Sequence, residues 1–160
     1  MSERIVKEKS KGSVLVVGVD LTDVSEHLLA TARQILRDAG EGELHVVHVV
    51  PREPFTQRIT NPPRSRDPGE IAGVEAAQWE LGRLSAALAD GSKVRVVTHT
   101  PIGDPAYEVV RVAREVGASL VLVETHDDKR LFHVSVATQI VATAPCSVLT
   151  LRPQMGEPAL

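Results

Sequence analysis

Residues 119–137 read SLVLVETHDDKRLFHVSVA, and this stretch decides the fold. An unbroken apolar run from Leu120 to Val123 stops at a charged turn, and a helix-like pattern resumes near Val134. Short apolar runs of this kind are typical of strands that are buried on both faces of a parallel sheet. In open α/β sheets the loops that follow such strands lie at the carboxyl edge of the sheet, where ligands bind. The stretch therefore predicts a ligand-site position in the turn after residue 123.

The same alternation of apolar runs and helical patterns extends over most of the chain. Four helical patterns separate the predicted strands, and Asp104 followed by Pro105 is a typical helix start. We therefore predict a fold of the α/β class. It has an open five-stranded, mostly parallel, doubly wound sheet with helices on both faces and strand order 3-2-1-4-5. In that order Asp20, after the first strand, and Thr125, after the fourth, face one crevice. The predicted strands cover residues 14–19, 44–50, 94–97, 120–123 and 147–151.

The domain organisation follows from where the periodic patterns begin and end. Residues 13–152 form a single predicted domain, because a chain of 160 residues has room for one substantial core. Residues 1–12 have little to bury and are expected to form a mobile arm, and residues 153–160 a loose tail. The Pro- and Arg-rich stretch 51–69 lacks periodicity and predicts a long surface loop.

Composition excludes several classes of protein. A net charge of -3 and 2% aromatic residues disfavour nucleic-acid binding, which relies on basic surfaces and stacking platforms. Cys146 is the only cysteine, so no intrachain disulfide forms and a reducing compartment is expected. No apolar run reaches the ~18 to 20 residues of a membrane span. We therefore expect a soluble, cytoplasmic protein with no membrane or nucleic-acid partner.

Four segments carry a resemblance to a known family. The stretches VVGVDLTD, LHVVHVVP, GDPAYEVVRVAREVGASLVLVETH and SVATQIVATAPCSVLTLRP resemble, in order and spacing, the universal stress protein family over roughly residues 13–152. The resemblance implies a UspA-like domain with the adenine nucleotide alpha hydrolase-like fold. It also implies a homodimer formed through the last strand, here Ser147 to Leu151, and membership of one of two branches, of which only one binds ATP.

The phosphate loop of the ATP-binding branch is degenerate in this chain. That loop has the pattern Gly, two residues, Gly, nine residues, Gly, then Ser or Thr. The three glycine positions fall at Glu124, Asp127 and Val134, and only Ser135 is retained. The spacer, residues 128–133, is also shorter than nine. Glycine lets backbone N–H groups approach phosphate oxygens, whereas acidic side chains add bulk and repulsion. The pattern indicates loss of ATP binding.

Five residues are candidates for a degenerate nucleotide crevice. Asp20 matches the family's crevice aspartate, although it equally suits a turn cap. Val49 would line an adenine slot, although a valine at a strand end is usually core. Thr125, His126 and Ser135 match positions that flank the phosphate loop, and Ser135 alternatively caps the last helix.

Neither a metal site nor a catalytic site is indicated. The spacing of His99, His126 and His133 matches no zinc pattern. The chain lacks a Walker loop and a nucleophile elbow, Cys146 has no sequence-linked base, and a weak phosphohydrolase would lack both base and metal ligand. We expect no enzyme, no resident cofactor and no metal.

The functional expectation is a non-catalytic, homodimeric stress-response module that has lost ATP binding and acts on an unknown protein partner. The apolar edge Ser147 to Leu151 favours a symmetry mate as its cover. The alternative is a regulatory switch that binds ATP or another adenine nucleotide through a rebuilt phosphate site. Lys129 and Arg130, with the arginines at 52, 58, 64 and 66, would neutralise the anion in that case.

Overall fold

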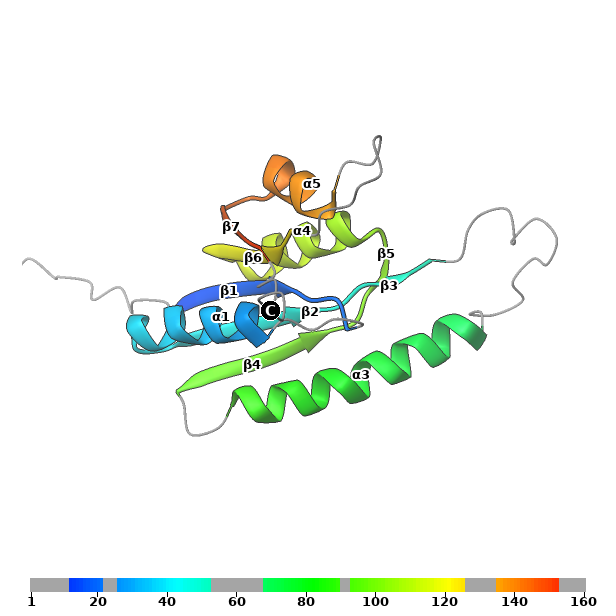
Figure 1. The fold of residues 1–160 in the computed structure, drawn as a ribbon, viewed down its shortest axis with the longest axis horizontal. Coiled ribbons are helices and arrows are strands. Elements are labelled where there is room, and N and C mark those ends of the chain that lie inside the picture. The colour runs from blue at the N-terminus through cyan, green and yellow to red at the C-terminus, as the bar shows by residue number, and fades with distance from the viewer. Residues whose placement is uncertain (1–11, 22–25, 53–67, 90–92, 126–134, 153–160) are drawn as a thin grey trace, which may run out of the picture.

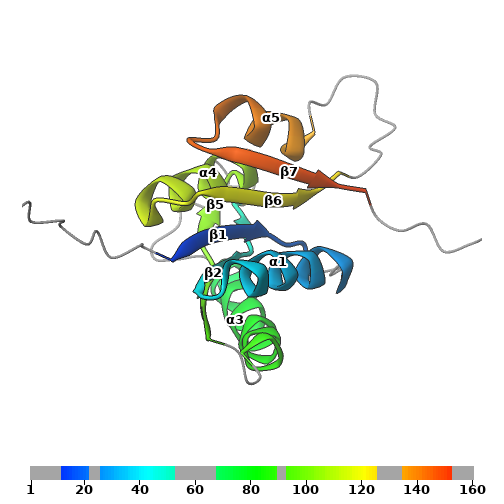
Figure 2. The ribbon, with the colours of Figure 1, turned by 90° about the vertical axis from the view of Figure 1, so that its left-hand side faces the viewer.

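The computed structural model describes residues 12–21, 26–52, 68–89, 93–125 and 135–152. A five-stranded sheet lies at its centre, in the order β4-β2-β1-β6-β7, and every neighbouring pair of strands is parallel. Figure 2 shows β7, β6 and β1 side by side. In chain order this is the predicted 3-2-1-4-5 arrangement, so the fold prediction is confirmed. The strands are β1 (Ser13–Gly18), β2 (Gly42–Val47), β4 (Val94–His99), β6 (Leu120–Glu124) and β7 (Ser147–Leu151).

Helices cover both faces of the sheet. Alternate residues of β1 point to opposite cores: Leu15 packs with the first pair of helices, and Val16 with the second pair. Both faces of the central strands are therefore buried, which explains their unbroken apolar runs. The first pair is α1 (Glu26–Ala39) and α3 (Pro68–Leu88), and the second is α4 (Pro105–Val116) and α5 (Val136–Thr143) (Figure 1). None of the described helices is long and apolar enough to cross a membrane.

Local signals set the ends of α4. The Asp104 carboxylate accepts a hydrogen bond from the Tyr107 backbone N–H at 2.9 Å, and Pro105 follows where its missing N–H costs nothing. Gly117 ends the helix with φ of 65°, a left-handed conformation that glycine adopts without strain. The predicted cap and the predicted end of this helix are both confirmed.

The predicted strand 44–50 divides into two. β2 ends at Val47, and Val50–Pro51 forms a separate short strand, β3, which pairs with β5 (Ile102–Gly103). Pro51 has no N–H to donate, and the short edge strand β3 accommodates it at its last residue. β4 also runs to His99, two residues beyond its predicted end. Figure 1 shows β3 and β5 leaving the sheet together.

Several predicted segments lie outside the described residues. They are the N-terminal arm (residues 1–11 of 1–12), the C-terminal tail and most of the 51–69 loop, so the predicted domain boundaries stay predictions.

Candidate functional site

A cavity of about 480 Å³ opens at the carboxyl ends of β1 and β6. The chain leaves these adjacent parallel strands toward opposite faces, and such switch points are where open α/β sheets bind ligands. Most of the cavity wall is aliphatic, and its size suits a small organic ligand. The aliphatic wall includes Val19, Val47, Val49, Val109, Val123 and Ile140. We call this cavity the crevice.

The predicted site residues separate into two groups. Asp20, which is exposed, and Val49, which is buried, both line the crevice. Thr125 and Ser135 instead make hydrogen bonds that stabilise the fold. The Thr125 backbone N–H donates to the Leu151 carbonyl oxygen at 2.8 Å, and the Ser135 hydroxyl caps α5 by accepting from the Thr138 N–H at 3.2 Å. His126 lies outside the described residues.

His48 is a crevice residue that the sequence analysis did not identify. Its Nδ1 lies 3.1 Å from the carbonyl oxygen of Val19. Because a carbonyl oxygen only accepts, Nδ1 carries the proton and Nε2 is left as an acceptor in the neutral ring. The one available signal was its place directly before Val49 at the end of a strand.

Glu124 adds an unusual negative group to the crevice. It occupies the first glycine position of the phosphate-loop pattern and lines the cavity. Its Oε1 atom is shielded from solvent and has no hydrogen-bond partner. A buried acceptor without a partner costs about 1–3 kcal/mol, and more when it is charged. Among the described residues that line the crevice, none is a lysine or an arginine, so the wall presents two carboxylates and, in His48, one imidazole.

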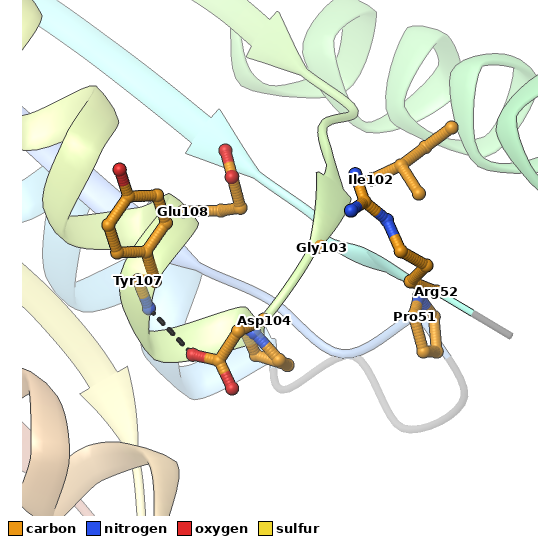
Figure 3. A pocket seen from close by; sticks show the side chains of 8 residues that line it. Pro51, Arg52, Ile102, Gly103, Asp104, Tyr107 and Glu108 are labelled. Atoms are coloured by element: carbon orange, nitrogen blue, oxygen red, sulfur yellow. Dashed lines mark hydrogen bonds between the residues drawn. The ribbon is translucent and has the colours of Figure 1, made fainter. Parts of the chain in front are cut away.

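A second, open hollow of about 550 Å³ adjoins the crevice and shares Pro51 and Pro105 with it. Figure 3 shows Arg52 beside Ile102 on one side, and Tyr107 and Glu108 on the other. Glu108 is already paired with Arg111 at 2.7 Å. Of the four arginines predicted to close over an anion, Arg52 lines this hollow rather than the crevice, and the other three lie outside the described residues.

The structure describes one of the three histidines that were considered as metal ligands, and it describes Cys146. His99 does lie at the carboxyl end of β4, but its ring is bonded to His45 at 2.9 Å, and His126 and His133 lie outside the described residues. Within the described ranges no three His, Cys, Asp or Glu side chains form a metal-binding group. Cys146 is half-buried and has no disulfide, and burial raises the pKa of its thiol above the ordinary value. A raised pKa suits a packing residue and not a nucleophile.

Comparison with known proteins places this geometry in context. A model of the universal stress protein family matches residues 13–152. Similar solved structures include the universal stress protein UspA from Lactobacillus plantarum, with a TM-score of 0.68, 18% identity, and coverage of 89% of this chain and 99% of that chain. A protein of the same family from Burkholderia pseudomallei has a TM-score of 0.62 and 27% identity, with coverage of 90% and 98%.

A third similar structure holds a ligand. It is the universal stress protein from Archaeoglobus fulgidus in complex with dAMP, with a TM-score of 0.58, 21% identity, and coverage of 86% of this chain and 96% of that chain. No curated protein sequence matches the chain significantly.

Proposed function

Because the chain belongs to the universal stress protein family, we propose that it is a non-catalytic, homodimeric stress-response module whose crevice has lost ATP binding. A chain whose single cysteine is Cys146 fits a reducing compartment, and we place it in the cytoplasm.

The Glu124 carboxylate, whose Oε1 atom is shielded from solvent and has no hydrogen-bond partner, carries this proposal. A phosphate chain that follows the glycine pattern of the ATP-binding branch would approach this side chain. Two like charges 4 Å apart repel by ~1 kcal/mol in water and by ~4 kcal/mol at an effective dielectric of 20. Asp20 adds a second carboxylate to the same cavity. The side chain also takes the place of a glycine, whose backbone N–H would otherwise approach the phosphate oxygens.

Isothermal titration with Mg-ATP and with ADP tests the loss of binding. We expect no heat of binding at micromolar protein and ligand, while the dAMP-binding relative from Archaeoglobus fulgidus, titrated with dAMP, serves as the positive control. A micromolar dissociation constant for either nucleotide would contradict the proposal.

A second candidate function is a nucleotide-binding switch with a rebuilt phosphate site. The observation that favours it is the crevice itself, which keeps about 480 Å³ of mostly aliphatic space, as a purine would require. Lys129 and Arg130, which lie outside the described residues, would then replace the glycines. A nucleotide-induced rise in melting temperature that disappears in the double variant Lys129→Ala, Arg130→Ala would support the switch. A rise in melting temperature that persists in the double variant would count against a phosphate site formed by Lys129 and Arg130.

The homodimer part of the proposal rests on β7. This strand pairs with β6 on one side, and within the described chain no strand pairs with its other side. Val148 and Leu149 pack only partly against the two cores. An apolar edge of this kind needs a cover, and an identical strand across a two-fold axis provides one. Sedimentation velocity at micromolar concentration should show a dimer, and a purely monomeric boundary would refute this part.

A further inference from the structure

Two histidines form a bonded pair between β2 and the edge strand β4. His45 is buried, with 5% of its surface exposed, and its Nδ1 lies 2.9 Å from Nε2 of the half-buried His99. The ring centroids are 5.2 Å apart. In the described chain β4 pairs with β2 alone, so this bond is a side-chain link that supplements the backbone ladder at the sheet edge.

Charged groups from three elements face the pair. Glu43 on β2 lies 3.2 Å from His45 Nε2, and Arg95 on β4 lies 3.2 Å from the other Glu43 oxygen. The hydrogen bond with His45 is the main cause that lowers the pKa of Glu43, so this carboxylate stays ionised. From α4, Glu115 and Arg111 act on His99 in opposite directions.

α3 packs against the other face of β4 through Leu81 and Leu88, and the uncharged amide of Gln78 donates to the Thr100 hydroxyl, just after the strand, at 3.5 Å.

The ionised carboxylate fixes the tautomers of both rings. Glu43 only accepts, so His45 Nε2 carries a proton and, in the neutral ring, Nδ1 is the acceptor. His99 must then donate from Nε2. One added proton leaves the bond intact. It can enter His99 Nδ1 while Nε2 still donates, or it can enter His45, which then donates to His99 in its other tautomer. A second added proton leaves N–H groups on both sides of the 2.9 Å contact and no lone pair between them, so the bond is lost.

We propose that the His45–His99 pair is an acid-sensitive latch on the edge strand β4, closed while at least one ring is neutral and open when both rings are protonated. The latch does not depend on any crevice ligand, so it stands or falls separately from the loss of ATP binding.

Opening of the latch reaches the crevice through the backbone. The His48 N–H donates to the His99 carbonyl oxygen at 3.0 Å, and the His48 ring donates to the Val19 carbonyl oxygen at the crevice wall. A loosened end of β4 therefore releases the segment that holds His48. Proton uptake at the sheet edge becomes coupled to the shape of the crevice.

The direction of the pH effect follows from linkage. Burial, and then repulsion from His45, lower the pKa of His99 below its ordinary value of 6.5. The unfolded chain therefore takes up this proton at a higher pH than the folded chain does. Stability from the latch is fully present above about pH 6.5 and is lost as the pH falls toward the lowered pKa of folded His99.

A histidine NMR titration of the wild-type protein is the first test. The His99 ring should titrate below the ordinary histidine pKa of 6.5. A His99 ring that titrates at or above this value overturns the proposal.

Urea unfolding at pH 7.5 and pH 5.0 is the second test, with His99→Gln as the variant. The glutamine amide keeps a donor for His45 but cannot titrate. The unfolding constant of the wild type should rise more than that of the variant, by up to tenfold for each unit of the separation between the folded and unfolded pKa values of His99 that lies above pH 5.0. His27→Gln, which removes an exposed histidine of α1, is the matched control and should behave as wild type. Equal rises in wild type and His99→Gln overturn the latch.

Amide exchange locates the opening. The His48 amide reports on β4, and the Val19 amide, which donates to the Val47 carbonyl oxygen at 2.9 Å, reports on the sheet centre. After correction for intrinsic rates, the protection of His48 relative to Val19 should fall between pH 7.5 and 5.0 in the wild type and stay constant in His99→Gln. A constant ratio in the wild type would exclude an opening at β4.

Discussion

Gly42 at the start of β2 lies against Ser13 at the start of β1, so closely that a Cβ atom on residue 42 would overlap the Ser13 carbonyl oxygen. The same atom would lie 2.7 Å from Cδ2 of Leu36, which is completely buried in α1. A glycine here lets two central strands and a helix approach one another. A side chain at this position would force the backbone of Ser13 or the side chain of Leu36 to move.

Gly42→Ala should therefore destabilise the fold. The clash involves backbone, which moves less easily than a side chain, so we expect a loss of about 1–3 kcal/mol in the free energy of unfolding. Gly82→Ala is the matched control, because nothing lies within 4 Å of a Cβ there and the residue is inside α3. That change should stabilise by roughly 0.5–1 kcal/mol. Urea unfolding of both variants measures the difference, and equal effects would refute the packing argument.

Asp104→Ala should cost about 1 kcal/mol through loss of the α4 cap. The carboxylate accepts a hydrogen bond from the Tyr107 N–H, and because Asp104 is exposed the substitution removes few other contacts. Asp104→Asn retains an oxygen acceptor and should stay close to the wild type. Thermal unfolding of the three proteins tests this order. A loss in Asp104→Asn as large as in Asp104→Ala would mean that charge, and not capping geometry, stabilises the helix.

The sequence predicted the features that depend on local chemistry. The apolar runs identify the central strands because each is buried on both faces, and the caps at Asp104 and Gly117 act within one turn. The pairing of β3 with β5 escaped prediction because two-residue strands show no periodicity. The bond between His45 and His99 escaped because it joins residues 54 positions apart.

The candidate site was predicted only in part, for a related reason. Asp20 and Val49 follow strands, and the strand order alone brings such ends to one edge. The neighbours of Thr125 depend on which strand lies beside β6. Its hydrogen bonds to Leu151 could not be read from the sequence around residue 125.

Glu124→Met should leave the free energy of unfolding at neutral pH unchanged or raise it by up to about 1 kcal/mol. The glutamate holds an oxygen without a partner away from solvent, and replacement of such a group by an apolar one of similar shape removes its desolvation cost. Thr138→Met, at an exposed position of α5 that contributes to its capping, is a comparison expected to lose stability. Urea unfolding at pH 7 is the measurement. A loss above about 1 kcal/mol in Glu124→Met would show that the carboxylate stabilises the crevice.

Thr150→Lys should weaken the proposed dimer. Thr150 is exposed on β7, and a lysine on an edge strand discourages pairing with another strand, because the two-fold axis brings two copies of the charge together. Thr98→Lys places the same charge at an exposed position of β4, the opposite edge of the sheet, and is the matched control. Sedimentation velocity across a concentration series should show a raised dissociation constant in Thr150→Lys alone. If Thr98→Lys dissociates the protein instead, the dimer forms through β4, and equal effects of the two lysines would point to net charge rather than to either edge.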